Sequence, residues 1–232
     1  MRIRASLVGL ALMLLILSSQ PACALLPFAV STPTSGKNLV YDAPVSLSIR
    51  DGAFLPGTSI GYGGELSNGA AKVLIQGQVA AKQVADSLEW EGTPVPSVSI
   101  KLSTRILSFD EQAIHLIGTG HIEIADAAPQ VGTAPVSTLI EFNAPVTYSL
   151  NKNGMIPGSR ISFVGATKEG AQFAGLGGYP YRNSLDSLEY SGRVNPQVFV
   201  KLDLRVLNYS DSSVLLGGTA NVKVEPLPKA TQ

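Results

Sequence analysis

The feature that most constrains the fold of this 232-residue chain is a long match between its two halves. The matching segments keep the same order, at offsets of 101 and then 100 positions: Ala43-Pro44-Val45 with Ala144-Pro145-Val146, Pro56-Gly57 with Pro157-Gly158, Gly69-Ala70 with Gly170-Ala171, Asp86-Ser87-Leu88-Glu89 with Asp186-Ser187-Leu188-Glu189, Lys101 with Lys201, Arg105 with Arg205, and Gly118-Thr119 with Gly218-Thr219. One single-residue gap between Ala70 and Asp86 accounts for the change of offset. Such an ordered self-match indicates an internal duplication.

A period of this length is that of a duplicated domain, because solenoid repeats are only about 20–45 residues long. We therefore expect one repeat at 40–126, a linker at 127–140 and a second repeat at 141–228. The linker carries Ala, Pro, Gly and Thr, as loops between domains commonly do. Residues 25–39 are rich in Ser, Thr and Pro without an apolar period, so we expect a flexible lead-in there.

Within each repeat the apolar residues follow a β pattern. They occupy alternate positions from Val198 to Val206, and again from Val214 to Val224 after a polar turn, which predicts a hairpin. The first repeat shows the same pattern over Val98–Leu107 and Ile114–Ile124. We expect an all-β protein: two tandem copies of a roughly six-stranded antiparallel unit, each a small barrel or a sandwich. Periodicity does not distinguish these two architectures.

Ala70–Val84 is rich in Ala, Gln and Lys, and helix propensity alone would assign it to a helix. The corresponding segment of the second copy, Ala174–Tyr181, contains three glycines and a proline, which an ordinary helix does not tolerate. If the copies share a fold, both segments are strands or loops.

Residues 1–24 have the composition of a secretory signal peptide: a positively charged start, an apolar stretch over Leu7–Leu17, and Ala22-Cys23-Ala24 as an A-x-A cleavage site. We expect export to the periplasm, the cell surface or the medium, a mature chain that begins at Leu25, and no membrane span after cleavage. The alternative is a lipoprotein with Cys23, the only cysteine, as its lipid attachment site. Gln20 and Pro21 do not fit the usual lipoprotein signal.

The charge balance argues against nucleic acid as a partner. The chain has 17 basic and 17 acidic residues, and removal of Arg2 and Arg4 with the signal leaves 15 against 17, a net charge of −2. A basic stripe, which nucleic-acid binding needs, is absent from the sequence.

Gly57-Thr58-Ser59-Ile60-Gly61 matches the G-x-S-x-G motif of serine hydrolases, with Asp and His residues following in the chain order of a triad. The motif works only where a strand, a sharp turn and a helix succeed one another, so that the serine stands above a parallel sheet. Here a β pattern continues after Ser59, and the second copy has Ser162 in place of the second glycine. We interpret the segment as a turn that leads into a strand.

Two further sets of polar residues bear on metal binding and acid–base chemistry. His115, His121 and Glu123 share a strand face, but the two histidines are six positions apart, roughly 20 Å in a strand, so we expect no metal site and no cofactor. Asp86 and Glu89, like Asp186 and Glu189, are three positions apart and would point to opposite faces. We expect Asp86, Arg105, Asp186 and Arg205 to have structural roles, with the aspartates binding backbone N–H groups at strand starts.

The segment Gly177 to Arg182 is the strongest candidate for a recognition site. It places Tyr179, Tyr181 and Arg182 in a Gly-Pro loop, a combination typical of binding surfaces. The first copy lacks these residues, so such a site would belong to the second copy alone. The alternative is that the tyrosines pack on the core.

Taken together, these features favour an exported, non-catalytic envelope or secreted protein with a binding or scaffolding role, whose partner is a protein or a glycan. The alternative function is an exported hydrolase that uses Ser59 or the carboxylates.

Overall fold

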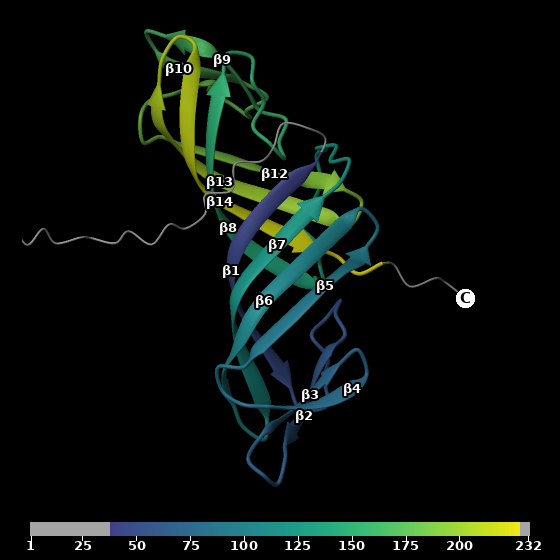
Figure 1. The fold of residues 1–232 in the computed structure, drawn as a ribbon. Helices are drawn as coiled ribbons and strands as arrows, with labels where there is room; N and C mark the ends of the chain where they lie inside the picture. The colour runs from purple at the N-terminus through teal and green to yellow at the C-terminus, as the bar shows by residue number, and fades with distance from the viewer. Residues whose placement is uncertain (1–37, 228–232) are drawn as a thin grey trace, which may run out of the picture.

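A computed structural model describes residues 38–227, which form fourteen strands in four antiparallel sheets without a helix (Figure 1). The strands are β1 (Leu39–Arg50), β2 (Ile60–Glu65), β3 (Ala71–Ile75), β4 (Gln78–Lys82), β5 (Ser87–Val95), β6 (Val98–Phe109), β7 (Ala113–Ile124), β8 (Ile140–Asn151), β9 (Ser162–Thr167), β10 (Gly170–Ala174), β11 (Tyr181–Arg182), β12 (Ser187–Asn195), β13 (Val198–Tyr209) and β14 (Ser213–Val224). The all-β prediction is confirmed. Over this range, no helix is long and apolar enough to span a membrane. The expected signal peptide, Cys23 and nearly all of the expected lead-in lie outside the described residues.

Each half of the chain contains one four-stranded and one three-stranded sheet. The large sheets have the orders β1-β7-β6-β5 and β8-β14-β13-β12, and the small ones β2-β3-β4 and β9-β10-β11. Counted from the first strand of each half, the strand orders of the corresponding sheets are the same. Each half has seven strands, one more than the expected six. All four sheets are open, because β1 and β5, like β8 and β12, lie at opposite edges and do not pair. The barrel alternative is therefore wrong.

The long hairpins follow from the alternation of apolar residues. β6 pairs with β7 and β13 with β14, as the sequence predicts, and each pair contains a bulge at the same place, Ile106/Ser108 and Val206/Asn208. The helical alternative for Ala70–Val84 is wrong, because this segment forms β3 and β4 around a turn at Gln76-Gly77. Both turn residues have positive φ, 52° and 81°, which interrupts any helix there.

The small sheets also locate the single-residue difference between the halves. Tyr62 lies opposite Val73, and Phe163 lies opposite Phe173, so the first hairpin spans one residue more than the second. From there on the register agrees, since Ala71 faces Lys82 and Ala171 faces Arg182. The single-residue difference therefore lies in the β2–β3 hairpin, between Tyr62 and Val73. The expected position, between Ala70 and Asp86, is wrong because it lies further along the chain.

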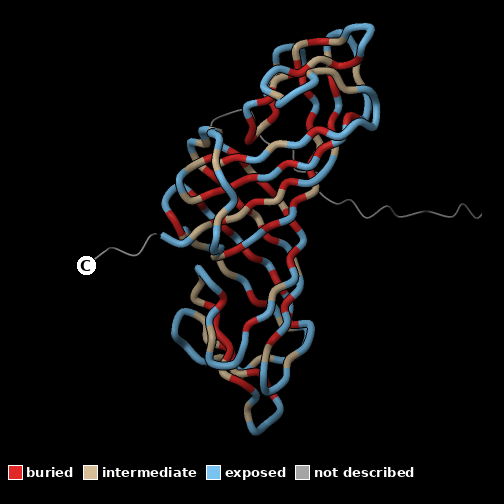
Figure 2. Tube along the Cα trace, turned by 180° about the vertical axis from the view of Figure 1, so that it is seen from behind, coloured by how far each residue is buried: buried red, intermediate tan, exposed pale blue. Residues whose placement is uncertain are grey.

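The hydrophobic core is shared by the two halves. In Figure 1 the two large sheets cross at the centre of the molecule, with the small sheets at opposite ends, and Figure 2 shows buried chain running through the crossing. Tyr41 of β1 and Phe142 and Tyr148 of β8 are all almost fully buried in one continuous cluster. Burial raises the pKa of both phenols well above the usual range, so both remain protonated.

The two Pro-Gly turns that match between the halves pack across this interface in a reciprocal way. A Cβ on Gly57 would meet Pro94 of its own half and then Leu139, which directly precedes β8, whereas a Cβ on Gly158 would meet Tyr41 and Leu39 of β1. Both glycines have positive φ, 77° and 75°. Because a side chain would meet both a strained backbone and a neighbour, these turns accept only glycine easily.

We expect Gly158→Ala to destabilise the protein more than Gly52→Ala. Both positions have similar positive φ, 75° and 71°, so both changes should cost about 1–2 kcal/mol in backbone strain. Only at Gly158 would the new Cβ lie 2.8 Å from the Tyr41 hydroxyl, whereas Gly52 has open space around it. Overpacking should add roughly 1–3 kcal/mol, measured by chemical denaturation. Equal losses of stability in the two variants would contradict this prediction, because they would show that Tyr41 can move aside without a loss of free energy.

Candidate functional site

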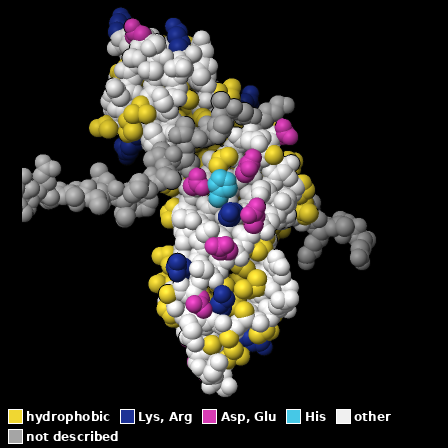
Figure 3. Space-filling model, in the orientation of Figure 1, with side chains coloured by type: hydrophobic (Ala, Val, Ile, Leu, Met, Phe, Trp, Pro, Cys, Tyr) yellow, Lys and Arg dark blue, Asp and Glu magenta, His cyan; other side chains and the backbone are white. Residues whose placement is uncertain are grey.

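The outer face of the first large sheet, which points away from the shared core, carries a row of charged residues across all four strands. In register, Asp42 of β1 faces His121 of β7, which faces Lys101 of β6, which faces Glu91 of β5. The His121 Nδ1 lies 2.7 Å from an Asp42 carboxylate oxygen, and the Lys101 Nζ lies 3.9 Å from Glu91. Figure 3 shows side chains of both charges gathered around a histidine on this face.

The second half has a different row at the same positions. Asn221 takes the place of His121 and donates hydrogen bonds to Asn143, at 2.7 Å, and to Glu141. In the first half, His115 lies beside Ser48, away from His121, and the Glu123 carboxylate accepts a hydrogen bond from Asn38 at 2.9 Å. Among the described residues, no three His, Cys, Asp or Glu side chains form a group that could hold a metal ion.

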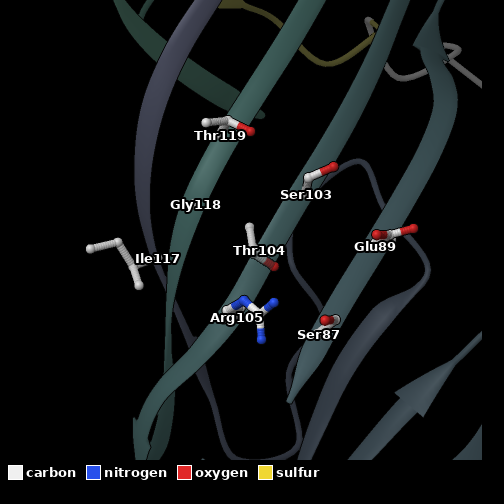
Figure 4. A pocket seen from close by; sticks show the side chains of 8 residues that line it. All are labelled: Ser87, Glu89, Ser103, Thr104, Arg105, Ile117, Gly118 and Thr119. Atoms are coloured by element: carbon white, nitrogen blue, oxygen red, sulfur yellow. The ribbon is translucent and has the colours of Figure 1, made fainter. Parts of the chain in front are cut away.

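A shallow hollow of about 240 Å³ lies further along this outer face (Figure 4). The side chains of Glu89, Ser103, Arg105 and Thr119 stand around it, and Gly118 forms part of its floor. A Cβ on Gly118 would collide with the Ser103 carbonyl group, so the two strands approach too closely there for any side chain. Hydroxyl, carboxylate and guanidinium groups thus surround a floor that is partly backbone.

Five residues of this hollow are identical at the equivalent positions of the second half: Ser187, Glu189, Arg205, Gly218 and Thr219. The three that differ are Ser103, Thr104 and Ile117, which correspond to Asp203, Leu204 and Gly217. The sequence shows these identities, but it does not show that they gather on one exposed face. Only the pairing of β5, β6 and β7 brings them together.

The four residues expected to be structural make hydrogen bonds with the backbone. The Asp86 carboxylate accepts from the Gln83 N–H at 2.8 Å, and Asp186 accepts from the Asn183 N–H at 2.7 Å, each just before a strand. Arg105 donates to the Ala85 carbonyl at 2.9 Å, and Arg205 donates to the Leu185 carbonyl at 3.1 Å. Ala85 and Leu185 both have φ of 72°. No ion pair joins either aspartate to its arginine within residues 38–227.

The loop with Tyr179, Tyr181 and Arg182 lies at the β9–β11 end of the molecule, away from the crossing of the large sheets. Tyr179 is 63% exposed, and its ring meets that of Tyr181 edge-on at 5.4 Å. Arg182 donates to the Tyr179 and Tyr181 carbonyls at 2.7 and 2.8 Å and to the Ser187 carbonyl at 2.9 Å. The guanidinium therefore braces its own loop, while one tyrosine ring is largely open to solvent.

Ser59 lies in a turn that differs from a nucleophile elbow. The Thr58 hydroxyl donates to the Leu55 carbonyl at 2.9 Å and accepts from the Ile60 N–H, which closes the turn. Strand β2 begins at Ile60, where the elbow requires a helix. In the second half, Ser159 makes the same two hydrogen bonds at the position of Thr58.

The segment expected to be a linker contacts the second large sheet. Gln130 forms a β-bridge with Arg193 of the edge strand β12. Arg193 also makes two hydrogen bonds to Glu225, and the two side chains are only 27% and 21% exposed. These bonds hold the pKa of Glu225 below its usual range and raise that of Arg193. A hollow of about 370 Å³ lies between the linker and this strand.

Comparison with known proteins provides no identification: no family model, no curated protein and no solved structure matches this chain.

The Arg193–Glu225 pair predicts a pH dependence of stability. Because the folded pKa of Glu225 is lowered, its contribution is present above the unfolded pKa of about 4.3 and is lost as pH falls through the folded pKa. Glu225→Gln should lower stability at pH 7 by roughly 1–2 kcal/mol and flatten the acid limb of a stability–pH curve. Glu169→Gln, at a looser 3.8 Å pair with Lys168, serves as the control and should change little. Identical acid limbs for Glu225→Gln and wild type would contradict the prediction.

A melting experiment separates the two roles of the Tyr179 loop. Truncation of the exposed ring in Tyr179→Ala should cost about 1 kcal/mol or less. Phe173→Ala, a change in the adjacent strand β10 at a side chain only 2% exposed, should cost roughly 3–5 kcal/mol. A loss at Tyr179 as large as that at Phe173 would assign the ring to the core and remove the loop as a recognition surface.

Proposed function

We propose that this chain is an exported, non-catalytic envelope or secreted protein that binds or scaffolds another component, and that its two halves are copies of one unit. The expected signal peptide supports export, and the ordered self-match, together with the equal strand orders, supports the duplication. The partner is a protein or a glycan that contacts the outer faces of the large sheets.

The observation that carries this proposal is the identity of exposed residues between the halves. Most buried positions stay apolar because they fill one core, but exposed positions are free to differ unless they are used. Arg105 and Arg205 have a structural reason, since each binds a carbonyl group of a strained turn. Glu89 and Glu189 are exposed and have no hydrogen bond or ion pair within the described part of the chain.

The lysines support the same view. Lys101 pairs with Glu91 of the neighbouring strand, whereas Lys201 pairs with Asp203 two positions along its own strand, at 3.1 Å. The lysine is thus the same in both halves although its intramolecular partner is not. Thr119 and Thr219 are likewise exposed and identical. A Glu, a Lys, an Arg and a Thr at equal spacing on both outer faces provide donors and acceptors for a polar partner surface.

Charge reversal on both faces tests the proposal. We expect the double variant Glu89→Lys/Glu189→Lys to fold normally but to bind its partner about tenfold or more weakly. Each new lysine would repel the group of the partner that contacts the carboxylate in the wild type. Glu91→Lys is the matched control, since it makes the same change two residues along the same face, where the second half has Ser191. Binding would be measured to purified envelope glycans on an array and to envelope proteins by surface plasmon resonance.

Equal binding by the double variant and the control would reject the outer faces as the binding surface. The hydrolase alternative is tested in parallel with ester, peptide and glycoside substrates. Turnover that disappears in Ser59→Ala would overturn the non-catalytic assignment.

A further inference from the structure

Within residues 38–227, the four open sheets have eight edge strands, and seven of these carry a feature that hinders the addition of a further strand. β1 and β8 each contain a proline, Pro44 and Pro145. β12 is bridged on its outer side by Gln130 of the expected linker. β2 and β9 are bridged on their outer sides by Phe54 and Met155.

β5 and β11 are protected by their own sequences. β5 contains Pro94 at a bulge, and Glu89 and Glu91 lie on one face, so two such strands would bring like charges together if they paired. β11 has only two residues and directly follows Pro180. Short strands, prolines, bulges and charges are the usual means by which proteins keep a sheet edge from pairing with other chains.

β4 is the edge strand that lacks such protection in the described part of the chain. Its five residues, Gln78–Lys82, contain no proline and form no bulge. The one charged side chain, Lys82, turns back onto its own chain, where the ammonium group donates to the Ser87 carbonyl at 3.3 Å. Val79 is 59% exposed. Figure 1 shows β4 in the small sheet at one end of the molecule, away from the crossing of the large sheets.

The backbone groups on the open side of β4 belong to Val79 and Ala81. A two-residue turn joins β3 to β4, so Gln78, which closes the turn, bonds to β3, and every second residue after it does the same. The second half shows this alternation, because the Phe173 N–H donates to the carbonyl of Pro180, which corresponds to position 80. The N–H and C=O groups of Val79 and Ala81 therefore point away from β3, and no group within residues 38–227 binds them there.

We propose that β4 pairs with β4 of a second copy of this chain, antiparallel about a two-fold axis at Ala80, so that two small sheets become one six-stranded sheet. In this register Val79 of each copy exchanges hydrogen bonds with Ala81 of the other. Gln78 lies opposite Lys82, so no like charges meet, and two small Ala80 side chains lie side by side at the axis. The exposed Val79 side chain gains an apolar neighbour across the interface.

This association closes at a dimer, because both copies use the same strand and the interface is therefore isologous. The second half has no equivalent edge to extend the assembly. Gly178 and Pro180 take the places of Gln78 and Ala80, and only two residues there form a strand. A strand from a different protein would meet the same backbone groups, but the charges and small side chains of β4 are complementary to β4 itself.

Sedimentation velocity of the chain that starts at Leu25 tests the pairing. We expect the dimer fraction to rise with protein concentration. Ala81→Pro removes an N–H group that points to the second copy and none that bonds to β3, so it should weaken the dimer at least about tenfold. Val79→Lys should weaken it by about as much, because it brings two further charges into the interface. Val84→Lys is the matched control, since Val84 is 56% exposed and lies outside β4, and its dimer should form as in the wild type.

Disulfide formation tests the register. The chain from Leu25 contains no cysteine, so a single introduced cysteine can form a disulfide only between molecules. The two Ala80 residues would form a non-hydrogen-bonded pair with Cα atoms about 4.5 Å apart, which is within the range of a disulfide. Under mild oxidation, Ala80→Cys should form a linked dimer at least about tenfold faster than Gln78→Cys, whose position lies opposite Lys82 of the second copy.

A chain that stays monomeric at every concentration would overturn the proposal, as would equal rates of disulfide formation in the two cysteine variants. A dimer that persists in Val79→Lys would also overturn it, because the interface would then lie elsewhere, and this variant decides the matter if Ala81→Pro fails to fold. A monomer whose binding to an envelope protein is lost in Val79→Lys would assign the edge to a strand of that protein instead. None of these results affects the outer-face proposal, which depends on the Glu89→Lys/Glu189→Lys variant.

Discussion

The structure depends on the burial of two apolar sheet faces against each other. Each large sheet has strands of up to twelve residues, and its own three-stranded sheet lies at one end of the molecule, away from the crossing of the large sheets (Figure 1). The remainder of each inner face can leave water only by packing on the sheet of the other half, around Tyr41, Phe142 and Tyr148. Because the two halves complete one core, their relative orientation is fixed by the same burial that stabilises each of them. The two outer faces are consequently held at one spacing and one angle.

This shared core also gives a physical meaning to the G-x-S-x-G match. Both Gly57 and Gly158 have positive φ, and a side chain at either position would meet a neighbour from the other half, Leu139 just before β8 or Tyr41 of β1. Thr58 and Ser159 close those turns through their hydroxyl groups. A glycine beside a hydroxyl residue is thus explained by packing and turn geometry. The literal motif arises where Ser59 and Gly61 happen to follow in the first half, and the second half keeps the turn without the motif.

The sequence predicts best what depends on neighbouring residues. The hairpins β6–β7 and β13–β14 follow from the alternation of apolar and polar residues. For Ala70–Val84, comparison with the glycine-rich counterpart in the second half excludes the helix that propensity alone would assign. What depends on distant pairing is not predictable in the same way. The contact between His121 and Asp42 joins residues 79 positions apart through the register of β1 and β7. The choice between barrel and sandwich depends on whether β1 and β5 meet, and no local pattern encodes that. The hollow around Glu89 is not predictable for the same reason, since it depends on the pairing of β5, β6 and β7. The sequence nevertheless contains a signal for it, because the residues that match between the halves include positions that face solvent.

The equal strand orders of the two halves, together with their shared core, have a consequence for binding. A partner with two copies of one epitope at the matching spacing could engage both outer faces, and the second contact would form at a high effective concentration. The benefit requires that the spacing stay fixed, and a shared core provides that more firmly than two domains on a linker would. Features present in only one half, such as His121 with Asp42 or the ring of Tyr179, cannot contribute to such two-site binding. They can instead distinguish the two ends of the molecule, so a partner without internal symmetry would bind it in one orientation.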